Sequence, residues 1–288
     1  MIEELKNKLV LCIMNTKNLR HLDSFFVKNR LEKYILTYAD SFKKLKIEVN
    51  RKGIEKIEKD KEFKKIIKNI RDDLRILYGS FLTNDFLKIK KINLKKSNLN
   101  INEYLKLHKS TKERIDYYEQ IYDEIFDWYK PKKIADLACG LNPLSYNLIE
   151  KKLNYKPFFL AVDLSSQDML FLNNFFRENN IDGLAQNYDI TELNFLDNKK
   201  FKRCDMVFFF KALDSFEYIK KNISKKIIQE IKINKIVVSF ATKSLIAKKE
   251  FKKERRNWFF NFLEKQNYDY KVFEVENEMF ILIDKSIK

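Results

Sequence analysis

Four short, almost wholly apolar runs alternate with helical stretches after Pro131, and this alternation limits the fold more than any other feature. The runs are "KIADLAC" from Lys133, "FFLAVDL" from Phe158, "CDMVFFFKAL" from Cys204 and "KIVVSFAT" from Lys235. A strand that is apolar on both sides has to be buried on both sides, as it is in parallel sheets covered by helices. The pattern therefore predicts an α/β fold with a mostly parallel sheet.

The end of the chain has a different pattern. Two further strand-like runs, "YDYKVFEV" from Tyr268 and "EMFILID" from Glu278, are separated by only a few residues. A crossover between parallel strands needs a much longer connection. These runs therefore predict an antiparallel C-terminal hairpin.

Residues 1–100 are typical of helices. Apolar side chains recur there at spacings of three and four, for example in "LRHLDSFFVKNRLEKYILTYADSF" from Leu19. A basic connector without any acidic residue, "LKIKKINLKKSN" from Leu87, follows. We therefore predict an all-helical N-terminal domain over residues 1–100 and an α/β domain over residues 101–288.

One more helix is predicted before the first apolar run. In "STKERIDYYEQIYDEIFDWYK", Ser110 or Thr111 could cap the helix, and Glu113 follows Ser110 by three residues, as in a capping box. Pro131 should end this helix.

Positive charge is concentrated in two segments of the chain, whose formal net charge is +17. Residues 1–100 carry 25 Lys and Arg against 13 Asp and Glu, and residues 243–256 carry 7 against 2. A general bias toward lysine would not concentrate charge in this way, whereas a polyanion-binding surface would. We expect RNA contacts from two clusters: Lys88, Lys90, Lys91, Lys95 and Lys96, and Lys248, Lys249, Lys252, Lys253, Arg255 and Arg256.

Several classes of protein are disfavoured. The three cysteines show no metal-ligand spacing and the chain has only two histidines, so we expect no metal site. No apolar run approaches the length of a membrane span, and the N-terminus lacks a signal-peptide pattern. We expect a cytoplasmic protein that acts as a monomer, without membrane contact.

The loop after the first apolar run, "IADLACGLNPLS", is the first candidate site. In doubly wound sheets, ligands bind at the carboxyl ends of the strands. Asp136 lies at such an end, and Gly140 would let a ligand approach the backbone. Asp163 ends the next run and could hold a ribose diol, and Asp189 in "NYDI" could meet an adenine amino group.

This loop lacks the G-x-G-x-x-G pattern that cradles a pyrophosphate. S-adenosylmethionine has no pyrophosphate, so the strand-end acids fit a site for it better than a dinucleotide site. An ordinary strand–turn–helix connection is the alternative that the loop alone leaves open.

Four motifs in sequence order extend the comparison: "LHKSTKERIDYYEQIYDEIF", "DLACGLNPLS", "MVFFFKALDSFE" and "VVSFATKSL". Together they resemble the aminoglycoside-resistance methyltransferases that modify guanine N7 of 16S ribosomal RNA, over roughly residues 100–285. The resemblance implies a Rossmann-like class I methyltransferase domain that binds S-adenosylmethionine. It also implies that the helical N-terminal domain docks on the small ribosomal subunit.

The resemblance also implies roles for individual residues. Arg114 would pair with the methionine carboxylate of the cofactor. The cofactor-binding set would be His108, Thr111, Arg114, Asp136, Ala138, Gly140, Asn142, Pro143, Asp163, Leu164, Asp189, Ile190, Lys211 and Leu213. The target base would be positioned by Phe240, Lys243, Ser244 and Asp214.

Two positions depart from the family pattern. Ala138 and Ala241 stand where the family usually has Gly and Pro. Alanine should preserve the turn at 138 unless that position needs a positive φ. The second departure lies nearer the base and bears on the choice of target atom.

No catalytic acid or base is required for guanine N7, because this nitrogen has a lone pair and carries no proton. The enzyme has to align N7 with the methyl group and exclude water. We expect the base to be flipped out and stacked on an aromatic ring such as Phe240 or Trp258. The alternatives are another base atom, such as cytosine N4, and a non-catalytic RNA-binding assembly factor.

Overall fold

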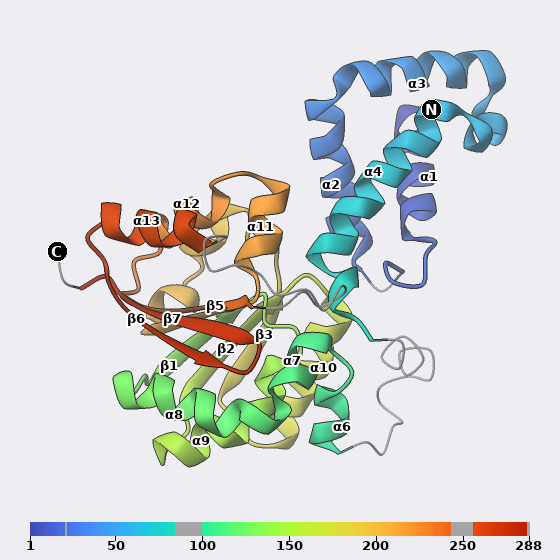
Figure 1. Ribbon diagram of the computed structural model, residues 1–288. Coiled ribbons are helices and arrows are strands. Elements are labelled where there is room, and N and C mark those ends of the chain that lie inside the picture. The colour runs from blue at the N-terminus through green and yellow to red at the C-terminus, as the bar shows by residue number, and fades with distance from the viewer. Residues whose placement is uncertain (21, 84–99, 243–255, 287–288) are drawn as a thin grey trace. The chain divides into compact units, whose positions relative to one another are not determined.

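The computed structural model describes residues 1–20, 22–83, 100–242 and 256–286 (Figure 1). The chain divides into two compact units, Met1–Leu82 and Thr83–Lys288. The domain boundary predicted at residue 100 follows the connector 84–99, which lies outside the described residues. That boundary stays a prediction.

The regular elements of the first unit's described residues are all helices, as predicted. Its elements are α1 (Ile2–Met14), α2 (Ser24–Thr37), α3 (Ala39–Lys52), η1 (Ile54–Lys59), α4 (Lys61–Leu77) and η2 (Gly79–Phe81). Aspartates begin two of the helices. The carboxylate of Asp23 accepts from the first amides of α2, and that of Asp60 accepts from those of α4. Such caps satisfy amide groups that have no partner within the helix.

The apolar spacing of three and four in this unit has the expected result. One face of each long helix is buried, and the side chains of Leu9, Leu31, Leu45 and Leu74 are fully inaccessible to solvent. The other faces carry lysine and glutamate, several of them ion-paired, as in Lys6–Glu32 at 3.1 Å. The helices are therefore held together by one continuous stripe of apolar residues.

The second unit is built on a seven-stranded sheet with the order β3-β2-β1-β4-β5-β7-β6. The strands are β1 (Lys133–Leu137), β2 (Phe158–Asp163), β3 (Gly183–Asn187), β4 (Met206–Phe210), β5 (Lys235–Ala241), β6 (Asp269–Val275) and β7 (Glu278–Asp284). Strands β1 to β5 pair in parallel, and β7 pairs antiparallel with both β5 and β6. The predicted mostly parallel sheet and the C-terminal hairpin are both confirmed.

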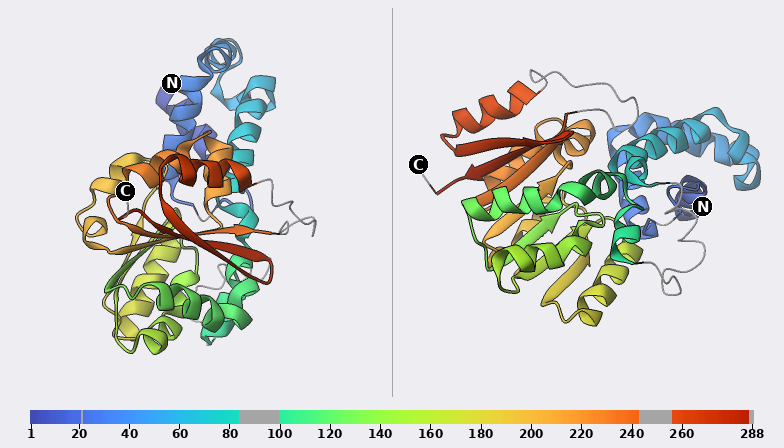
Figure 2. Two further views of the ribbon diagram at one scale, coloured as in Figure 1. Left: turned by 60° about the vertical axis from the view of Figure 1, so that its left-hand side comes forward. Right: turned by 60° about the horizontal axis from the view of Figure 1, so that its bottom comes forward.

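Helices cover both faces of this sheet (Figures 1 and 2). One face carries α8 (Tyr118–Trp128), α9 (Tyr146–Leu153) and α10 (Ser166–Glu178). The other carries α11 (Leu213–Ile219), α12 (Ile223–Glu230) and α13 (Asn257–Lys265). Every residue of β4 is buried, as an apolar run between two helical layers requires.

Short turns complete the unit. They are η5 (Asn142–Ser145) after β1, and η6 (Leu193–Asp197) and η7 (Phe201–Arg203) before β4. Strand order reverses between β1 and β4, because β2 and β3 lie on one side of β1 and all later strands lie on the other. This position is the switch point at which doubly wound sheets bind ligands.

The single helix predicted from Ser110 to Pro131 is wrong in detail. The structure has α6 (Ile101–Leu105), α7 (Lys109–Arg114), the 3₁₀ turn η4 (Ile115–Tyr117) and then α8. The capping box forms earlier than predicted, between Asn100 and Glu103 at the start of α6. The hydroxyl of Thr111 donates instead to two carbonyl groups, which diverts it from any capping role.

Candidate functional site

The loop after β1 has two residues in the left-handed region. Ala138 has φ 56° and Gly140 has φ 52°. A Cβ atom added to Gly140 would lie 2.9 Å from Cε1 of His108, so this position needs glycine for both conformation and space. Alanine was expected to preserve the turn at position 138 unless that position needs a positive φ. The structure shows that it does have a positive φ, so Ala138 is strained.

The ends of β1 and β2 are joined by the carboxylate of Asp163. Its Oδ2 accepts from the amide of Gly140 at 2.8 Å, and its Oδ1 accepts from the amide of Leu164 at 2.6 Å. A carboxylate has about four lone-pair positions, so these two bonds orient the group without exhausting its capacity. The structure thus brings Asp163 to the loop, at the carboxyl edge of the sheet.

Asp136 is the most deeply buried acid of the loop, with no exposed surface. Its Oδ2 accepts from Nδ2 of Asn142 at 2.7 Å, whereas its Oδ1 has no hydrogen-bond partner among the described residues. Burial raises the pKa of this carboxyl group to about 7, and the hydrogen bond from Asn142 offsets only part of that effect. Asp136 is therefore an incompletely satisfied acceptor beside the switch point.

Two tyrosines of α8 form hydrogen bonds with the segment that follows the β1 loop. The hydroxyl of Tyr118 donates to Oδ1 of Asn142 at 2.9 Å, and that of Tyr122 lies 2.6 Å from Oγ of Ser145. Both rings are almost fully buried. These tyrosines were not among the residues predicted from the sequence. Their four-residue spacing on an apolar helix face was the available clue, because a buried tyrosine hydroxyl needs a hydrogen-bond partner.

The segment before η4 packs against the same loop. Nδ1 of His108 lies 2.9 Å from Oγ of Ser110, and the ring is the nearest neighbour of the Gly140 backbone. Thr111 is fully buried, and its hydroxyl donates to Leu105 and His108 carbonyl oxygens. The Thr111 hydroxyl is thus bonded to the backbone beside the loop, and its role in cofactor binding stays a prediction.

Arg114 has a partner that the sequence did not predict. Its Nε and Nη2 donate to Glu278 of β7 at 2.9 and 2.7 Å, and both side chains are almost completely buried. A ligand carboxylate at Arg114, as the resemblance implies, would have to share or displace Glu278. The sequence held one clue, since an acid that opens an otherwise apolar strand requires a buried partner.

A second cation completes this cluster. Nζ of Lys211, which follows β4, lies 3.1 Å from Glu278 and 2.6 Å from Glu113. Burial alone would raise the pKa of Glu278, but the charges of Arg114 and Lys211, with hydrogen bonds from Arg114 and Ser239, outweigh it and lower that pKa. Lys211 itself has φ 56°, and its amide is held by Ser239 of β5.

A cavity of about 240 Å³ adjoins the cluster. Its lining includes Glu113, Arg114, Lys211, Asn277 and Glu278. Oδ1 of Asn277 is buried there without a hydrogen-bond partner among the described residues. This cavity and the β1 loop are the two regions in which the structure gathers sequence-predicted residues.

The remaining predicted cofactor residues differ in their exposure to solvent. Asp189 follows β3 and is half-buried, with its Oδ1 accepting from the amide and hydroxyl of Thr191. Ile190 is buried, and the Leu213 side chain has no exposed surface. The structure therefore does not support Leu213 as a residue that lines an open pocket.

Those predicted RNA-contact residues that the structure describes form contacts within the protein. Arg256 is buried and binds Asp214 through two hydrogen bonds of 2.6 and 2.7 Å. Its guanidinium lies 4.4 Å from the ring centre of Phe240, which is 1% exposed and packs on Phe259. Neither the guanidinium of Arg256 nor the ring of Phe240 is open to RNA in this structure.

Other predicted RNA and base contacts lie outside the described residues. They are Lys88, Lys90, Lys91, Lys95, Lys96, Lys243, Ser244, Lys248, Lys249, Lys252, Lys253 and Arg255. Their roles stay predictions from the sequence.

The two buried cysteines of the second unit are poor candidates for a nucleophile. Burial raises the pKa of Cys204 to about 12 and raises that of Cys139 as well, so neither thiol is prepared as a nucleophile. Within residues 1–20, 22–83, 100–242 and 256–286, no three His, Cys, Asp or Glu side chains are grouped as metal ligands would be. No helix of that same set combines the length and the apolar character of a membrane span.

Curated relatives of this chain include methyltransferases of 16S ribosomal RNA. A 16S rRNA (guanine(1405)-N(7))-methyltransferase of Frankia casuarinae is 27% identical over 147 residues, which cover 50% of this chain and 49% of that protein. The chain thus spans about half the length of the curated relatives it matches.

Solved structures share the fold over nearly the whole chain. The 16S rRNA methyltransferase RmtF, in complex with S-adenosyl-L-homocysteine, superposes with a TM-score of 0.72 at 18% identity, covering 98% of this chain and 99% of that one. The 16S rRNA methylase RmtB superposes with a TM-score of 0.68 at 22% identity, covering 98% of each. These likenesses confirm the predicted methyltransferase fold.

The family model for ribosomal RNA methyltransferase (FmrO) matches residues 93–283. This range is well over half of the chain and contains strands β1 to β6, all of β7 except Asp284, the β1 loop and the Arg114 cluster. The chain therefore belongs to the FmrO family of ribosomal RNA methyltransferases.

Proposed function

We propose that this protein is an S-adenosylmethionine-dependent methyltransferase that modifies small-subunit ribosomal RNA at guanine N7. The family match over residues 93–283 carries the proposal, because it includes all the strand ends at which a ligand would bind. The relatives that it resembles are named as 16S rRNA guanine-N7 methyltransferases. Their shared target supports small-subunit RNA as the substrate.

The β1 loop fits the cofactor. Asp136 Oδ1 is a buried acceptor that receives no hydrogen bond from the described residues, and the ammonium group of the methionine moiety could satisfy it. Gly140 lets the His108 ring pack against the loop and donates its amide to Asp163, whose fixed carboxylate suits a ribose diol.

The other members of the predicted set have narrower roles in this proposal. Leu164, Asp189 and Ile190 would form the adenine end, at the carboxyl edges of β2 and β3. His108, Asn142 and Pro143 would keep the loop in place. S-adenosylmethionine, when bound, supplies a methyl group on an electrophilic sulfonium.

The chain has little proton chemistry to perform on guanine N7. That nitrogen offers a lone pair and releases no proton, so the residues have to hold the base in line and exclude water. The acids of the Arg114 cluster are committed to ion pairs, which agrees with a site that needs no general base. The raised pKa of Cys139 and of Cys204 disfavours attack on cytosine C5, which requires a thiolate.

Docking on the subunit would fall to the basic helical part of the chain. Residues 1–100 hold a net charge of +12, and phosphate contacts would make binding steeply dependent on salt. We also propose a cytoplasmic monomer, since the substrate is the ribosomal subunit.

Methyl transfer to isolated subunits tests the proposal. The protein is incubated with S-adenosylmethionine labelled in its methyl group and with small ribosomal subunits, and the ribosomal RNA is then digested for nucleoside mass spectrometry. We expect label in 7-methylguanosine. Asp163→Ala should abolish this label by weakening cofactor binding while leaving subunit binding intact.

Two outcomes would overturn the proposal. Cofactor binding by calorimetry without label transfer to RNA would indicate a non-catalytic assembly factor. Label in N4-methylcytidine would show that the base atom is wrong.

A further inference from the structure

A groove runs between α12 and α13, away from both regions described above. Its volume is about 720 Å³. Ten of its lining side chains are polar or charged: Lys220, Lys221, Asn222, Lys225, Lys226, Gln229, Glu230, Asn261, Lys265 and Gln266. Ile223 and Phe262 are buried beneath it, and Trp258 is half-buried on the α13 side.

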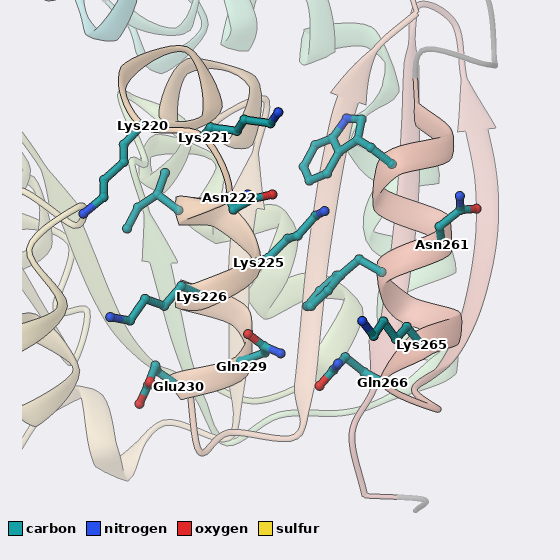
Figure 3. A pocket seen from close by; sticks show the side chains of 13 residues that line it. Lys220, Lys221, Asn222, Lys225, Lys226, Gln229, Glu230, Asn261, Lys265 and Gln266 are labelled. Carbon is teal, nitrogen blue, oxygen red and sulfur yellow. The ribbon is translucent and has the colours of Figure 1, made fainter.

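The charged side chains are not distributed evenly about the groove (Figure 3). Lys221 and Lys225 extend from the α12 side toward α13, and Lys265 extends back from α13. Lys220, Lys226 and Glu230 point to the opposite side of α12. The space between the helices is therefore faced by three ammonium groups, while the acid that lines the site points away.

These ammonium groups have no ion-pair partner among the described residues. Elsewhere in the same unit, lysines do have acidic partners, as in Lys151–Glu119 at 2.7 Å and Lys202–Asp197 at 2.8 Å. Uncompensated like charges that converge on one groove repel one another. Such an arrangement is stabilised when a polyanion enters.

The groove also has neutral donors and an aromatic wall. Gln229 and Gln266 carry amide groups that can donate to phosphate oxygens. Trp258 packs edge-on against Phe259, with ring centres 5.3 Å apart, and Nζ of Lys225 lies 5.6 Å from the indole ring. A fixed indole beside cations is the combination that single-stranded nucleic acids bind, through stacking and phosphate contacts.

We propose that the α12–α13 groove binds the phosphodiester backbone of ribosomal RNA, as a docking surface separate from the methyl-transfer site. This inference rests on the proposed function for the identity of the polyanion. An anionic membrane is the less favoured partner, because the apolar residues Ile223 and Phe262 form the buried floor and do not project. These lysines were not predicted from the sequence, because a single lysine says little about RNA binding in a chain so rich in lysine.

A pair of charge-reversal variants tests the groove. K225E/K265E takes one lysine from each wall, whereas K220E/K226E makes the same charge change at residues that point away. Binding of each full-length protein to small ribosomal subunits is measured by filter binding over a range of salt. We expect K225E/K265E to weaken binding by about tenfold or more and to reduce the salt slope by about 0.7 for each lost contact.

The controls separate charge from folding and from catalysis. K220E/K226E should stay within about twofold of the wild type, and the charge-keeping K225R/K265R should retain most of the affinity, since phosphate contacts depend on charge. All variants should bind S-adenosylmethionine like the wild type in calorimetry. Should the wild type bind subunits without transferring methyl groups, the proposed function fails while the groove can still be assessed.

Three results would overturn the inference. One is wild-type subunit affinity in K225E/K265E, and another is an equal loss in K220E/K226E. The third is loss of binding to phosphatidylserine vesicles with unchanged subunit binding, which would assign the groove to a membrane.

Discussion

Two buried carboxylates in the same unit, Asp136 in β1 and Glu278 in β7, are treated in opposite ways by their surroundings. Glu278 meets Arg114, Lys211 and the hydroxyl of Ser239, and its pKa is lowered despite complete burial. Asp136 has one amide donor, its other oxygen has no partner among residues that the structure describes, and its pKa is raised to about 7.

The number of hydrogen-bond and ion-pair partners distinguishes a carboxylate that stabilises the fold from one that is available to a ligand. A buried charge with several partners fixes the strands that carry it, here β7 against the segment before α8. A buried charge with too few partners costs stability that a ligand donor could restore. The predictions below begin with the change that would most disturb this contrast.

Removing the carboxylate at Glu278 should have the largest effect. Glu278→Ala leaves Arg114 and Lys211 buried side by side, and breaking a buried ion pair in this way typically costs about 3–5 kcal/mol. Urea unfolding of the full-length protein would measure the loss in the transition of the second unit.

Glu276→Ala is the matched control, because Glu276 lies in the same hairpin and is exposed. Its unfolding midpoint should stay close to that of the wild type. If Glu278→Ala is equally well tolerated, Glu278 is not the partner that holds the cluster.

Asp136 should give the protein an unusual dependence on pH. The native state keeps the proton up to about pH 7, whereas the unfolded chain releases it near the ordinary aspartate pKa of 3.8. Between these values the native state binds more protons, so the free energy of unfolding falls as pH rises, by about 1.4 kcal/mol per pH unit. Asp136→Asn should remove this slope between pH 5 and pH 7.

The comparison is made by urea unfolding of both proteins at each pH, so that other titrating groups cancel. Parallel curves for the wild type and Asp136→Asn would refute the raised pKa. Under the proposed function, wild-type affinity for the cofactor should also increase from pH 6 to pH 8, because the ionised carboxylate is the better acceptor.

Gly140→Ala should cost somewhat less. The new Cβ would meet the His108 ring at 2.9 Å and would sit at φ 52°. The left-handed conformation alone costs about 1–2 kcal/mol for a residue with a Cβ. Thermal unfolding would measure the loss, and calorimetry would show weaker cofactor binding.

Gly53→Ala separates strain from the steric contact. Gly53 has φ 77°, but nothing lies within 4 Å of an added Cβ. Gly140→Ala should therefore be the more destabilising of the two. Equal losses would mean that His108 yields freely.

Ala138→Gly should have the smallest effect, and it should be a gain. Glycine removes the strain at φ 56° but loses more entropy on folding, which leaves a net stabilisation of about 0.5–1 kcal/mol. Ala135→Gly, in the buried interior of β1, should instead destabilise the protein. A loss of stability in Ala138→Gly would contradict the strain assigned to this residue.

Much of the sheet could be predicted because its signals are local. Runs such as "MVFFF" of β4 are apolar throughout, and acids such as Asp163 mark where a strand leaves the core. Parallel pairing then places the strand-end acids at one edge, as observed for Asp163 and the Gly140 loop. These inferences need only the periodicity of the chain and the topology of the sheet.

The partners of charged residues could not be predicted in this way. Glu278 meets Arg114 across 164 residues of sequence, and no local pattern pairs them. The positive φ of Lys211 is imposed by hydrogen bonds to Ser239 on a neighbouring strand, which no lysine in a sequence reveals.

The separation between Arg114 and Glu278 also bears on how the protein is made. Translation delivers Arg114, then Lys211, and only much later the strand that neutralises them both. Until β7 emerges, the nascent sheet has an open edge at β5, Arg114 lacks the carboxylate of Glu278, and Lys211 keeps only the ion pair with Glu113. A shortened chain that ends before Glu278 would therefore leave the edge of β5 unpaired and would be more exposed to proteases and aggregation.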